Sequence, residues 1–587
     1  MRKFLGGAAA LGAGLLAASS GLPAHADGSG GYGGNDIKRV LLISIDGMHA
    51  LDFINCAQGI SGVNGGNPYC PNLADLADAG VNYLEAAASQ PSDSFPGLMA
   101  LVAGGSPRTV GAFYDVAYDR VLAPPAKTTG NGVAAGQCMP KTPNGTRTEY
   151  EEGIDKDQSK LDGGANDGSG GGITSIDKDR LIRDPFNGCK PVYPWNFVRT
   201  NTIFGVVHQA GGYTAWSDKH PSYSSVAGPG DGTNVDDYYS PEINSNVVPL
   251  PGVPGCSSVP DPTNTGSWTD SFDNIKCYDS LKVQAILNEI NGRDHTGAAK
   301  RPVPTLFGMN FQVVSVGQKL IEKSILKKGG YLDNEGRPSD ELLGEIQFAD
   351  TSIGKIVAAL KSRGLYQSTL IVISAKHGQS PIDSKRYLGI GVPSGSPITT
   401  SPAGILDALL PPSEQPFPPG NPMGDPPQIG PTEDDISLLW LSDSSQTTNA
   451  VQTLESTSPA TNNIAGIGEI FSGPGIAQMF NPAGLPPKGD PRTPDIIVQP
   501  NIGTTYSGST KKLAEHGGFA HDDLNVIMLV SNPSMSPSTV TSPVETTQVA
   551  PTILSVLGLD PDNLTAVQQE GTQILPGLGL DSGKSRY

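Results

Sequence analysis

Two residues in this sequence, a hydroxyl and an acid, could together support nucleophilic chemistry. Ser94 stands at a turn just before a small-residue apolar helix, and Asp46 ends an apolar strand expected over residues 40–46. A hydroxyl is a weak nucleophile at neutral pH, so it needs a base, a metal ion or a helix N-terminus to activate it. An Asp at the carboxyl end of a parallel strand lies where an open α/β sheet holds its site. The pair therefore predicts a nucleophile with a carboxylate nearby.

Imidazole and ammonium groups close to other apolar segments are further candidates: Lys376, His377, His516, Lys219 and His220. Imidazoles bind metal ions and transfer protons, and ammonium groups stabilise negative charge. Each candidate also has a purely structural interpretation. A serine before Phe-Pro commonly caps a helix, an Asp that closes a strand forms turns, and a His can fill a core. Asp218 could pair with Lys219 and His220 on a surface turn.

The elements that must position these residues alternate between strands and helices, which favours a mainly parallel sheet covered on both faces. Residues 71–80 and about 341–362 are expected to be helices. Most expected core strands are unbroken apolar runs, as strands buried on both faces should be: 40–46, 202–207, 305–311, 369–374, 495–499 and 525–530. The predicted fold class is α/β, a three-layer α/β/α sandwich around a mostly parallel sheet, with loop-rich insertions.

The distance between the first and last expected strands favours one interleaved domain over residues 37–575 of this 587-residue chain. Residues 1–26 are expected to be a signal peptide, because two positive charges precede a short apolar run and a small-x-small cleavage site. Residues 27–36 and 576–587 are expected to be flexible ends. Loop-rich insertions are expected in two irregular stretches, about 120–300 and 389–435.

Cysteines and net charge bear on the compartment and the partners. The six cysteines follow the expected signal peptide, and an even count in an exported chain indicates disulfide bonds. Neighbour pairing is the simplest connectivity: Cys56 with Cys70, Cys138 with Cys189, and Cys256 with Cys277. A formal charge of −19 argues against non-specific binding to nucleic acids or anionic membranes, and no apolar run is long enough for a membrane anchor. We expect a secreted or periplasmic protein that binds a small anionic partner.

The segments around Asp46 and Ser94 resemble the alkaline phosphatase superfamily, and most closely its type I phosphodiesterase/nucleotide pyrophosphatase branch. Pro71-Asn-Leu-Ala-Asp-Leu-Ala is similar to the family's PNLDxLAxxG stretch. The segment that ends at Lys376-His-Gly is similar to the approach to its S-D-H-G motif, and His516-Gly-Gly-Phe519 to its C-terminal H-G-x segment. The resemblance covers about residues 37–558, and the order and intervals of these landmarks imply the family's fold.

The family's chemistry uses two zinc-like ions, which clamp the attacking and leaving oxygens of a phosphate ester. The resemblance implies that Asp46, Ser94 and His377 contribute to one ion. It implies that His516 contributes to the other. Four positions depart from the family's pattern. Lys376 and Val314 each stand where the family has an Asp. Gln318 replaces a His, and Gly97 replaces an Asn. Because valine cannot bind a metal and glutamine is a poor zinc ligand, we expect one divalent ion, zinc by analogy, rather than two.

The remaining polar candidates are assigned to the substrate. Lys376 either points away from the site or offers a positive charge to an ester oxygen in place of an ion. Lys219 and His220 are expected to add positive charge and a proton donor to the same cleft, for which sulfatases, a sister branch, offer an analogy. Gln318 is expected to position water together with His516.

The resemblance favours an exported hydrolase of phosphate esters, with diesters preferred. Ser94 would attack the ester, and water would then release a phosphoseryl intermediate. Sulfate and phosphonate esters fit the same geometry. Two other functions stay open. One is a non-catalytic descendant that binds an anionic ligand, which the replaced metal ligands support, and the other is a transferase in which an alcohol takes the place of water.

Overall fold

A computed structural model describes residues 37–150, 153–246, 267–323, 325–390, 401–409, 432–456, 466–480, 489–507, 509 and 511–579. The expected signal peptide at 1–26 and the expected flexible segment at 27–36 lie outside these residues, as do residues 580–587 of the expected tail. What the sequence predicts for them stays a prediction.

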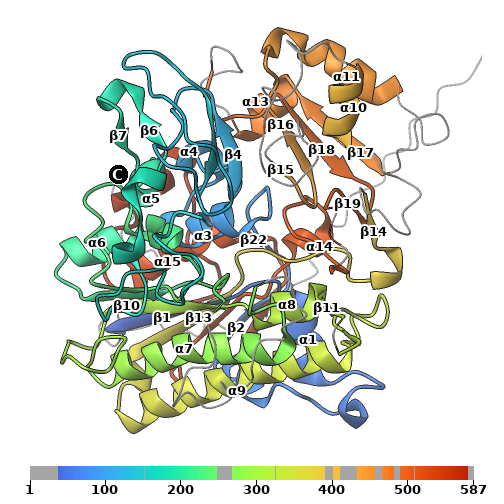
Figure 1. Cartoon of the computed structure of the whole chain (residues 1–587). Coiled ribbons are helices and arrows are strands. Elements are labelled where there is room, and N and C mark those ends of the chain that lie inside the picture. Colours follow the sequence, from blue (N-terminus) through green and yellow to red (C-terminus); the bar gives the residue numbers. More distant parts are fainter. Residues whose placement is uncertain are drawn as a thin grey trace, which may run out of the picture.

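An eight-stranded sheet runs through the centre of the described chain, in the order β21-β2-β20-β13-β1-β10-β8-β9 (Figure 1). Its strands are β1 (Arg39–Ile45), β2 (Gly80–Tyr83), β8 (Thr214–Ser217), β9 (Asp237–Tyr239), β10 (Leu306–Phe311), β13 (Thr369–Ser374), β20 (Leu529–Ser531) and β21 (Ser538–Val540). Only β20 is antiparallel to its neighbours, β13 and β2. The other pairs in this sheet are parallel. The predicted mostly parallel α/β sheet is confirmed.

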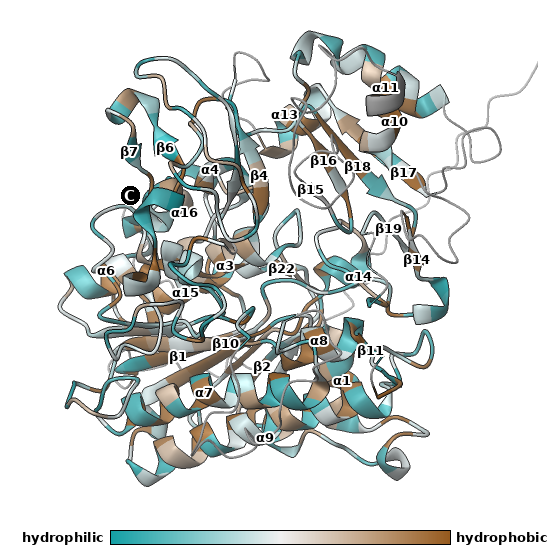
Figure 2. Cartoon of the chain, in the orientation of Figure 1, coloured by the Kyte–Doolittle hydropathy of each residue, from teal (hydrophilic) through white to brown (hydrophobic). Residues whose placement is uncertain are grey.

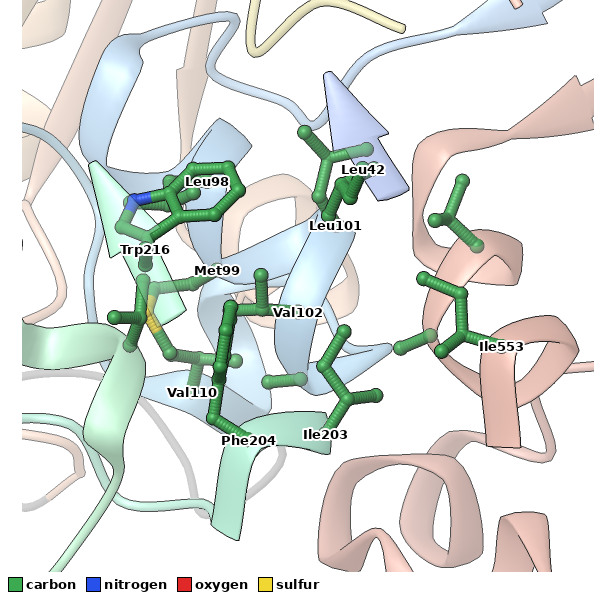
Figure 3. Close-up of a cluster of buried hydrophobic side chains, with 14 of the residues drawn as sticks. Leu42, Leu98, Met99, Leu101, Val102, Val110, Ile203, Phe204, Trp216 and Ile553 are labelled. Carbon is green, nitrogen blue, oxygen red and sulfur yellow. The ribbon is translucent and has the colours of Figure 1, made fainter. Parts of the chain in front are cut away.

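Successive residues of β1 point to opposite faces, and each face is covered by helices. Val40 and Leu42 pack into a cluster with α3 (Ser94–Ala103), α6 (Ile203–Gln209), α15 (Val549–Val556) and α16 (Thr565–Glu570); Figure 3 shows Leu42 among its partners. Leu41 and Ile43 pack against α1 (Ala50–Gln58), α2 (Pro71–Ala77), α7 (Phe272–Ile290), α8 (Val313–Lys319) and α9 (Asp340–Ser362). Brown apolar colour concentrates on the sheet, and teal lies along the outer sides of α7 and α9 (Figure 2). The three layers predicted from the sequence are present.

A second, four-stranded sheet lies to one side of the main sheet, at the upper right of Figure 1. Its order is β15 (Thr432–Glu433), β16 (Ser437–Leu439), β18 (Ile496–Pro500) and β17 (Ile467–Ser472). The helices near it are α10 (Pro402–Leu409), α11 (Thr447–Ser456) and α13 (Pro474–Phe480). The strand expected at 495–499 is therefore present as β18, but it belongs to this sheet and not to the central one.

Short elements complete the described fold. Two-stranded pairs join β3 (Ala86–Ala87) with β22 (Val544–Glu545), β4 (Val116–Asp119) with β5 (Thr146–Glu149), β6 (Arg183–Asp184) with β7 (Lys190–Pro191), β11 (Ile321–Glu322) with β12 (Lys327–Lys328), and β14 (Leu388–Gly389) with β19 (Thr504–Thr505). Single-turn helices are α4 (Pro107–Val110), α5 (Pro194–Phe197) and α14 (His521–Leu524).

Two predicted strands differ from the structure. Residues 202–207 form the start of α6 rather than a strand, with Thr202 as the helix N-cap. A short apolar run does not distinguish a buried helix from a buried strand by periodicity, which explains the error. The strand of this region is β8, which follows the Gly211–Gly212 turn. Of residues 525–530, only the last two belong to β20, and the preceding buried segment makes isolated bridges to Ala87 and His49.

Two of the predicted disulfides are confirmed, Cys56–Cys70 and Cys138–Cys189. Cys277 is also disulfide-bonded. Its predicted partner, Cys256, lies outside the described residues. Within the part of the chain that the structure describes, no helix has the length and apolar character needed to cross a membrane.

Two buried carboxyl groups join the four-stranded sheet to the main body. Asp435 lies between β15 and β16, and Asp523 belongs to α14. Both carboxyl groups approach Gly518: a Cβ atom added there would lie 2.0 Å from Asp435 Oδ2 and 2.3 Å from Asp523 Oδ2. Burial raises the pKa of Asp523 to about 7. Burial and the neighbouring Asp523 raise the pKa of Asp435 well above its usual value. Because both pKa values rise on folding, the folded state holds protons that the unfolded chain releases.

We therefore expect stability to fall as the pH rises from about 4, where unfolded carboxyls ionise, through about 7. Asp523→Asn removes this linked proton, so the variant should lose less thermal stability than the wild type between pH 5 and pH 9. Melting temperatures across this range measure the effect, with the exposed Asp562→Asn as the control. Parallel pH profiles for wild type and Asp523→Asn would contradict the raised pKa.

Candidate active site

Ser94 occupies the first turn of α3, a helix that is buried along its whole length. The N-cap of this helix is Asp93, whose Oδ2 accepts hydrogen bonds from the backbone N–H groups of Phe95 (3.2 Å) and Asp115 (2.9 Å). The capping role that a serine commonly has is therefore filled by its neighbour. The Ser94 hydroxyl instead makes contacts with side chains from other elements.

Three segments that are far apart in the sequence meet at the Ser94 hydroxyl. Its Oγ lies 3.1 Å from His377 Nε2 and accepts a hydrogen bond of 3.2 Å from Lys219 Nζ. His377 follows β13, and Lys219 follows β8. All three side chains are buried. The structure thus brings together the predicted nucleophile, a predicted metal ligand and a predicted substrate-binding lysine.

The hydrogen bonds of His377 define which ring nitrogen carries the proton. Its Nδ1 lies 2.8 Å from the carbonyl oxygen of Gly378, which can only accept, so Nδ1 is the donor. In the neutral ring, Nε2 then has a free lone pair and accepts the Ser94 O–H. Burial lowers the pKa of His377 below its usual value, although Asp46 opposes the shift. His377 is thus a neutral acceptor aligned with the Ser94 hydroxyl.

Asp46 follows β1 and is held by amide donors. Asn310 Nδ2 donates to its Oδ1 at 2.7 Å, and Gln312 Nε2 donates to its Oδ2 at 2.7 Å. Asp46 Oδ2 also lies 3.7 Å from His377 Nε2 and 3.9 Å from Lys376 Nζ. Burial alone would raise the pKa of this carboxyl, but Lys376 and His377 outweigh burial and hold it well below its usual value. Asp46 is therefore an anion beside the imidazole.

Lys376 points into the site and is fully buried, so an outward-turned lysine is excluded. Its Nζ lies 2.9 Å from Asp218 Oδ1 and 4.1 Å from the centre of the Tyr223 ring. Trp216 Nε1 donates to the other oxygen of Asp218 at 2.9 Å. Asp218 consequently faces the site and does not lie on a surface turn.

The other three candidates take different positions. The His516 ring stacks on His377 with 3.9 Å between centroids, and its Nδ1 lies 3.3 Å from Asp93 Oδ1. His220 pairs with Glu242 through Nδ1 at 2.9 Å. Gln318 belongs to a neighbouring cluster, where Nε2 donates to Gly47 O and Tyr331 Oη, both at 2.7 Å. His516 thus contacts the Ser94–His377 pair directly, whereas Gln318 bonds within a separate cluster.

Sequence reasoning missed several residues that support the site: Asp93, Tyr223, Asn310 and Gln312. Asn310 and Gln312 could have been found, because they lie at the carboxyl end of the strand expected at 305–311, where an open α/β sheet holds its site. Tyr223 carries no such signal, since its position over Lys376 depends on how the turn after β8 folds.

The divalent cation that the resemblance implies can be tested against this donor set. Both Asp46 oxygens accept hydrogen bonds from amide N–H groups. The Lys376 ammonium lies 3.9 Å from Asp46 Oδ2, and the Lys219 ammonium lies 3.2 Å from Ser94 Oγ. Two cations so close would repel a third. Over the described residues, no group of three or more His, Cys, Asp or Glu side chains could hold a metal ion. The residues present therefore do not fit a tightly bound divalent ion.

The model of the type I phosphodiesterase/nucleotide pyrophosphatase family matches residues 40–141 and 327–392. These two segments carry Asp46, Ser94 and His377. This match supports the resemblance to this branch of the alkaline phosphatase superfamily that the motifs indicate. Members of the family are generally metal-dependent.

Solved structures similar to this chain include ectonucleotide pyrophosphatase/phosphodiesterase 5 from mouse, at 13% identity and a TM-score of 0.49, covering 89% of this chain and 96% of that one. An inactive variant of the mouse protein in complex with AMP gives the same values. The human protein is similar at 13% identity and a TM-score of 0.48, covering 89% and 95%. No curated protein sequence matches significantly.

Gly97, where the family often has an asparagine, lies against the backbone of Lys376. A Cβ atom at Gly97 would lie 2.0 Å from the Lys376 carbonyl oxygen. We expect Gly97→Ala to lower the free energy of unfolding by about 1–3 kcal/mol, because either α3 or the Lys376 segment must move. Urea unfolding measures the change. Gly475→Ala is the control, since no atom lies within 4 Å of its Cβ position. Equal losses for the two variants would contradict the close approach.

Proposed function

We propose that this protein hydrolyses phosphate esters, with diesters preferred, and that Ser94 is its nucleophile. The observation that carries the proposal is the contact of Ser94 Oγ with the accepting Nε2 of His377, at 3.1 Å. A hydroxyl hydrogen-bonded to a neutral imidazole is the arrangement of an activated nucleophile. The family's phosphodiesterase and pyrophosphatase chemistry supports a phosphate ester as the substrate.

In the first step, Ser94 Oγ attacks phosphorus and its proton passes to His377 Nε2. The bond between phosphorus and the leaving oxygen breaks, the leaving oxygen keeps the electron pair, and His377 returns the proton to it. In the second step, a water molecule attacks phosphorus and gives its proton to His377. The bond to Ser94 Oγ then breaks, and the proton of His377 restores the hydroxyl.

Asp46 stabilises the imidazolium that forms in both steps. Its Oδ2 lies 3.7 Å from His377 Nε2, and its amide partners hold it in place. A fixed carboxylate that faces an imidazole favours the protonated ring without itself taking the proton. His516, stacked on the same ring, holds His377 in the orientation that faces Ser94.

The predicted cofactor is one divalent ion, zinc by analogy, on Asp46 and His377, with His516 as a ligand candidate for the second ion of the family. If bound, such an ion would polarise the ester and lower the pKa of the serine hydroxyl. The donors present do not fit it, so we assign no step to it. Export, through the signal peptide expected at residues 1–26, is likewise part of the proposal, and the disulfides Cys56–Cys70 and Cys138–Cys189 support it.

Hydrolysis of bis-p-nitrophenyl phosphate by the mature protein tests the nucleophile. Ser94→Ala should lower turnover by at least about 10³-fold, because nothing replaces the attacking oxygen. Ser362→Ala, which changes an exposed serine on α9, should leave turnover unchanged. Equal turnover in wild type and Ser94→Ala would exclude Ser94 as the nucleophile.

Two further experiments test the alternative functions. One analyses the products formed in the presence of an added alcohol, and the other measures phosphate binding. A product that carries the alcohol would indicate transfer rather than hydrolysis. Saturable binding of phosphate without turnover of phosphate, sulfate or phosphonate esters would favour the non-catalytic binding protein, which the replaced metal ligands at Val314 and Gln318 support.

The role of His377 gives a separate prediction. His377→Ala should lower turnover by about 10²–10⁴-fold, the usual contribution of a general base. His521→Ala, which changes an exposed histidine, is the matched control. The rate of release of p-nitrophenol measures both. A loss smaller than about tenfold would contradict a proton-transfer role for His377.

A further inference from the structure

We infer that the ammonium groups of Lys219 and Lys376 take the place of the family's metal ions, so that the site works without a bound divalent cation. The inference rests on the proposed ester hydrolysis and names the groups that supply its positive charge. Four observations support it: the contact of Lys219 with Ser94, the contacts of Lys376, the local charge balance, and the contacts of the residues that replace the second ion's ligands.

Lys219 makes the contact with the nucleophile that a metal ion makes elsewhere in the family. Its Nζ donates to Ser94 Oγ at 3.2 Å, so a full positive charge lies beside the oxygen that becomes negative as its proton leaves. A charge-assisted hydrogen bond of this kind stabilises an alkoxide more than the neutral hydroxyl. Because Ser94 Oγ accepts the bond from Lys219, its own proton remains free to be donated to His377 Nε2.

Lys376 stands where the family has a metal-binding Asp, and its side chain stays inside the site. Asp218 Oδ1 at 2.9 Å and Asp46 Oδ2 at 3.9 Å lie near its Nζ, and the Tyr223 ring lies beneath it. Replacing a carboxylate by an ammonium changes the local charge from −1 to +1. That difference equals the charge of one divalent ion, so the substitution supplies what the ion would have supplied.

The charged side chains that contact Ser94, His377 or Lys376 are two ammonium groups and two carboxylates. Lys219 and Lys376 are positive, and Asp46 and Asp218 are negative, with all four side chains buried. A divalent cation added to this set would leave an excess of two positive charges in a low-dielectric site, which is strongly unfavourable. A phosphate ester, in contrast, brings negative charge to the two ammonium groups.

The residues that replace two ligands of the second ion contact other protein groups instead. Val314 is fully buried among apolar side chains. Gln318 Nε2 is an N–H donor to Gly47 O and Tyr331 Oη, and a Cβ at Gly47 would lie 2.3 Å from Gln318 Oε1. The remaining ligand candidate, His516, stacks nearly parallel to His377, at an angle of 29°, so the two rings do not direct their lone pairs at one point.

Metal content and zinc titration test the inference directly. The full chain, purified without chelator, should contain well below one zinc, manganese or calcium ion per molecule by mass spectrometry. Calorimetric titration with zinc should show no stoichiometric binding. Turnover of bis-p-nitrophenyl phosphate should be unchanged by EDTA. One bound ion per chain, lost in Asp46→Asn, or activity that EDTA removes and zinc restores, would overturn the inference.

Lysine variants test the positive charges themselves. Lys219→Met and Lys376→Met keep most of the side-chain length but remove the charge, and each should lower turnover by about 10²–10³-fold, as loss of one charge-stabilising donor does. Lys355→Met, on the exposed face of α9, is the control. Circular dichroism shows whether each variant folds. Full activity in a folded Lys219→Met or Lys376→Met would overturn the inference.

The two proposals fail in different ways. If no ester is turned over, the proposed hydrolysis fails, and the zinc titration still decides whether the lysines exclude a metal ion. If esters are turned over with bound zinc, the proposed hydrolysis stands, and the inference that the lysines replace the metal ions fails.

Discussion

The alternation of buried charges around Ser94 is the constraint on which the site depends. Removing an ammonium or a carboxylate from water costs several kcal/mol, which only close pairing and hydrogen bonds offset. Lys376 therefore lies between Asp46 and Asp218. Asp46 also accepts hydrogen bonds from the amides of Asn310 and Gln312. Asp218 also accepts one from the Trp216 indole. The positions of these groups are tightly coupled, and a substrate anion must fit into the same balance.

The parallel sheet makes this pairing possible. Because β8, β10, β1 and β13 are adjacent and parallel, their carboxyl ends meet at one edge. Lys219, Gln312, Asp46 and Lys376 follow these four strands, one from each. The helix α3 brings Ser94 to the same edge from the covering layer, and Asp93 fixes its first turn. Rigid elements thus place every charged group, which suits chemistry that relies on fixed charges.

Two departures from the family's pattern, Gly97 and Lys376, lie against each other. The backbone of Lys376 lies against Gly97, where a Cβ atom would clash with the Lys376 carbonyl, so the asparagine of the family would clash there. At the second metal position, Val314 joins the apolar core and Gln318 bonds to Gly47 O. Each of these residues packs or hydrogen-bonds within the protein at its position.

Several features followed from the sequence by itself: the resemblance to the family, the central strands β1, β10 and β13, and the proximity of Asp46, Ser94 and His377. Motifs and unbroken apolar runs are local signals, which explains this success. The strand predicted at residues 202–207 is instead the start of α6, because a short apolar run fits both the helical and the strand period. Only the tertiary structure decided that Lys376 faces inward and that Lys219 contacts Ser94, because both depend on distances between strands far apart in the chain. It likewise separated Gln318 from the Ser94 contacts.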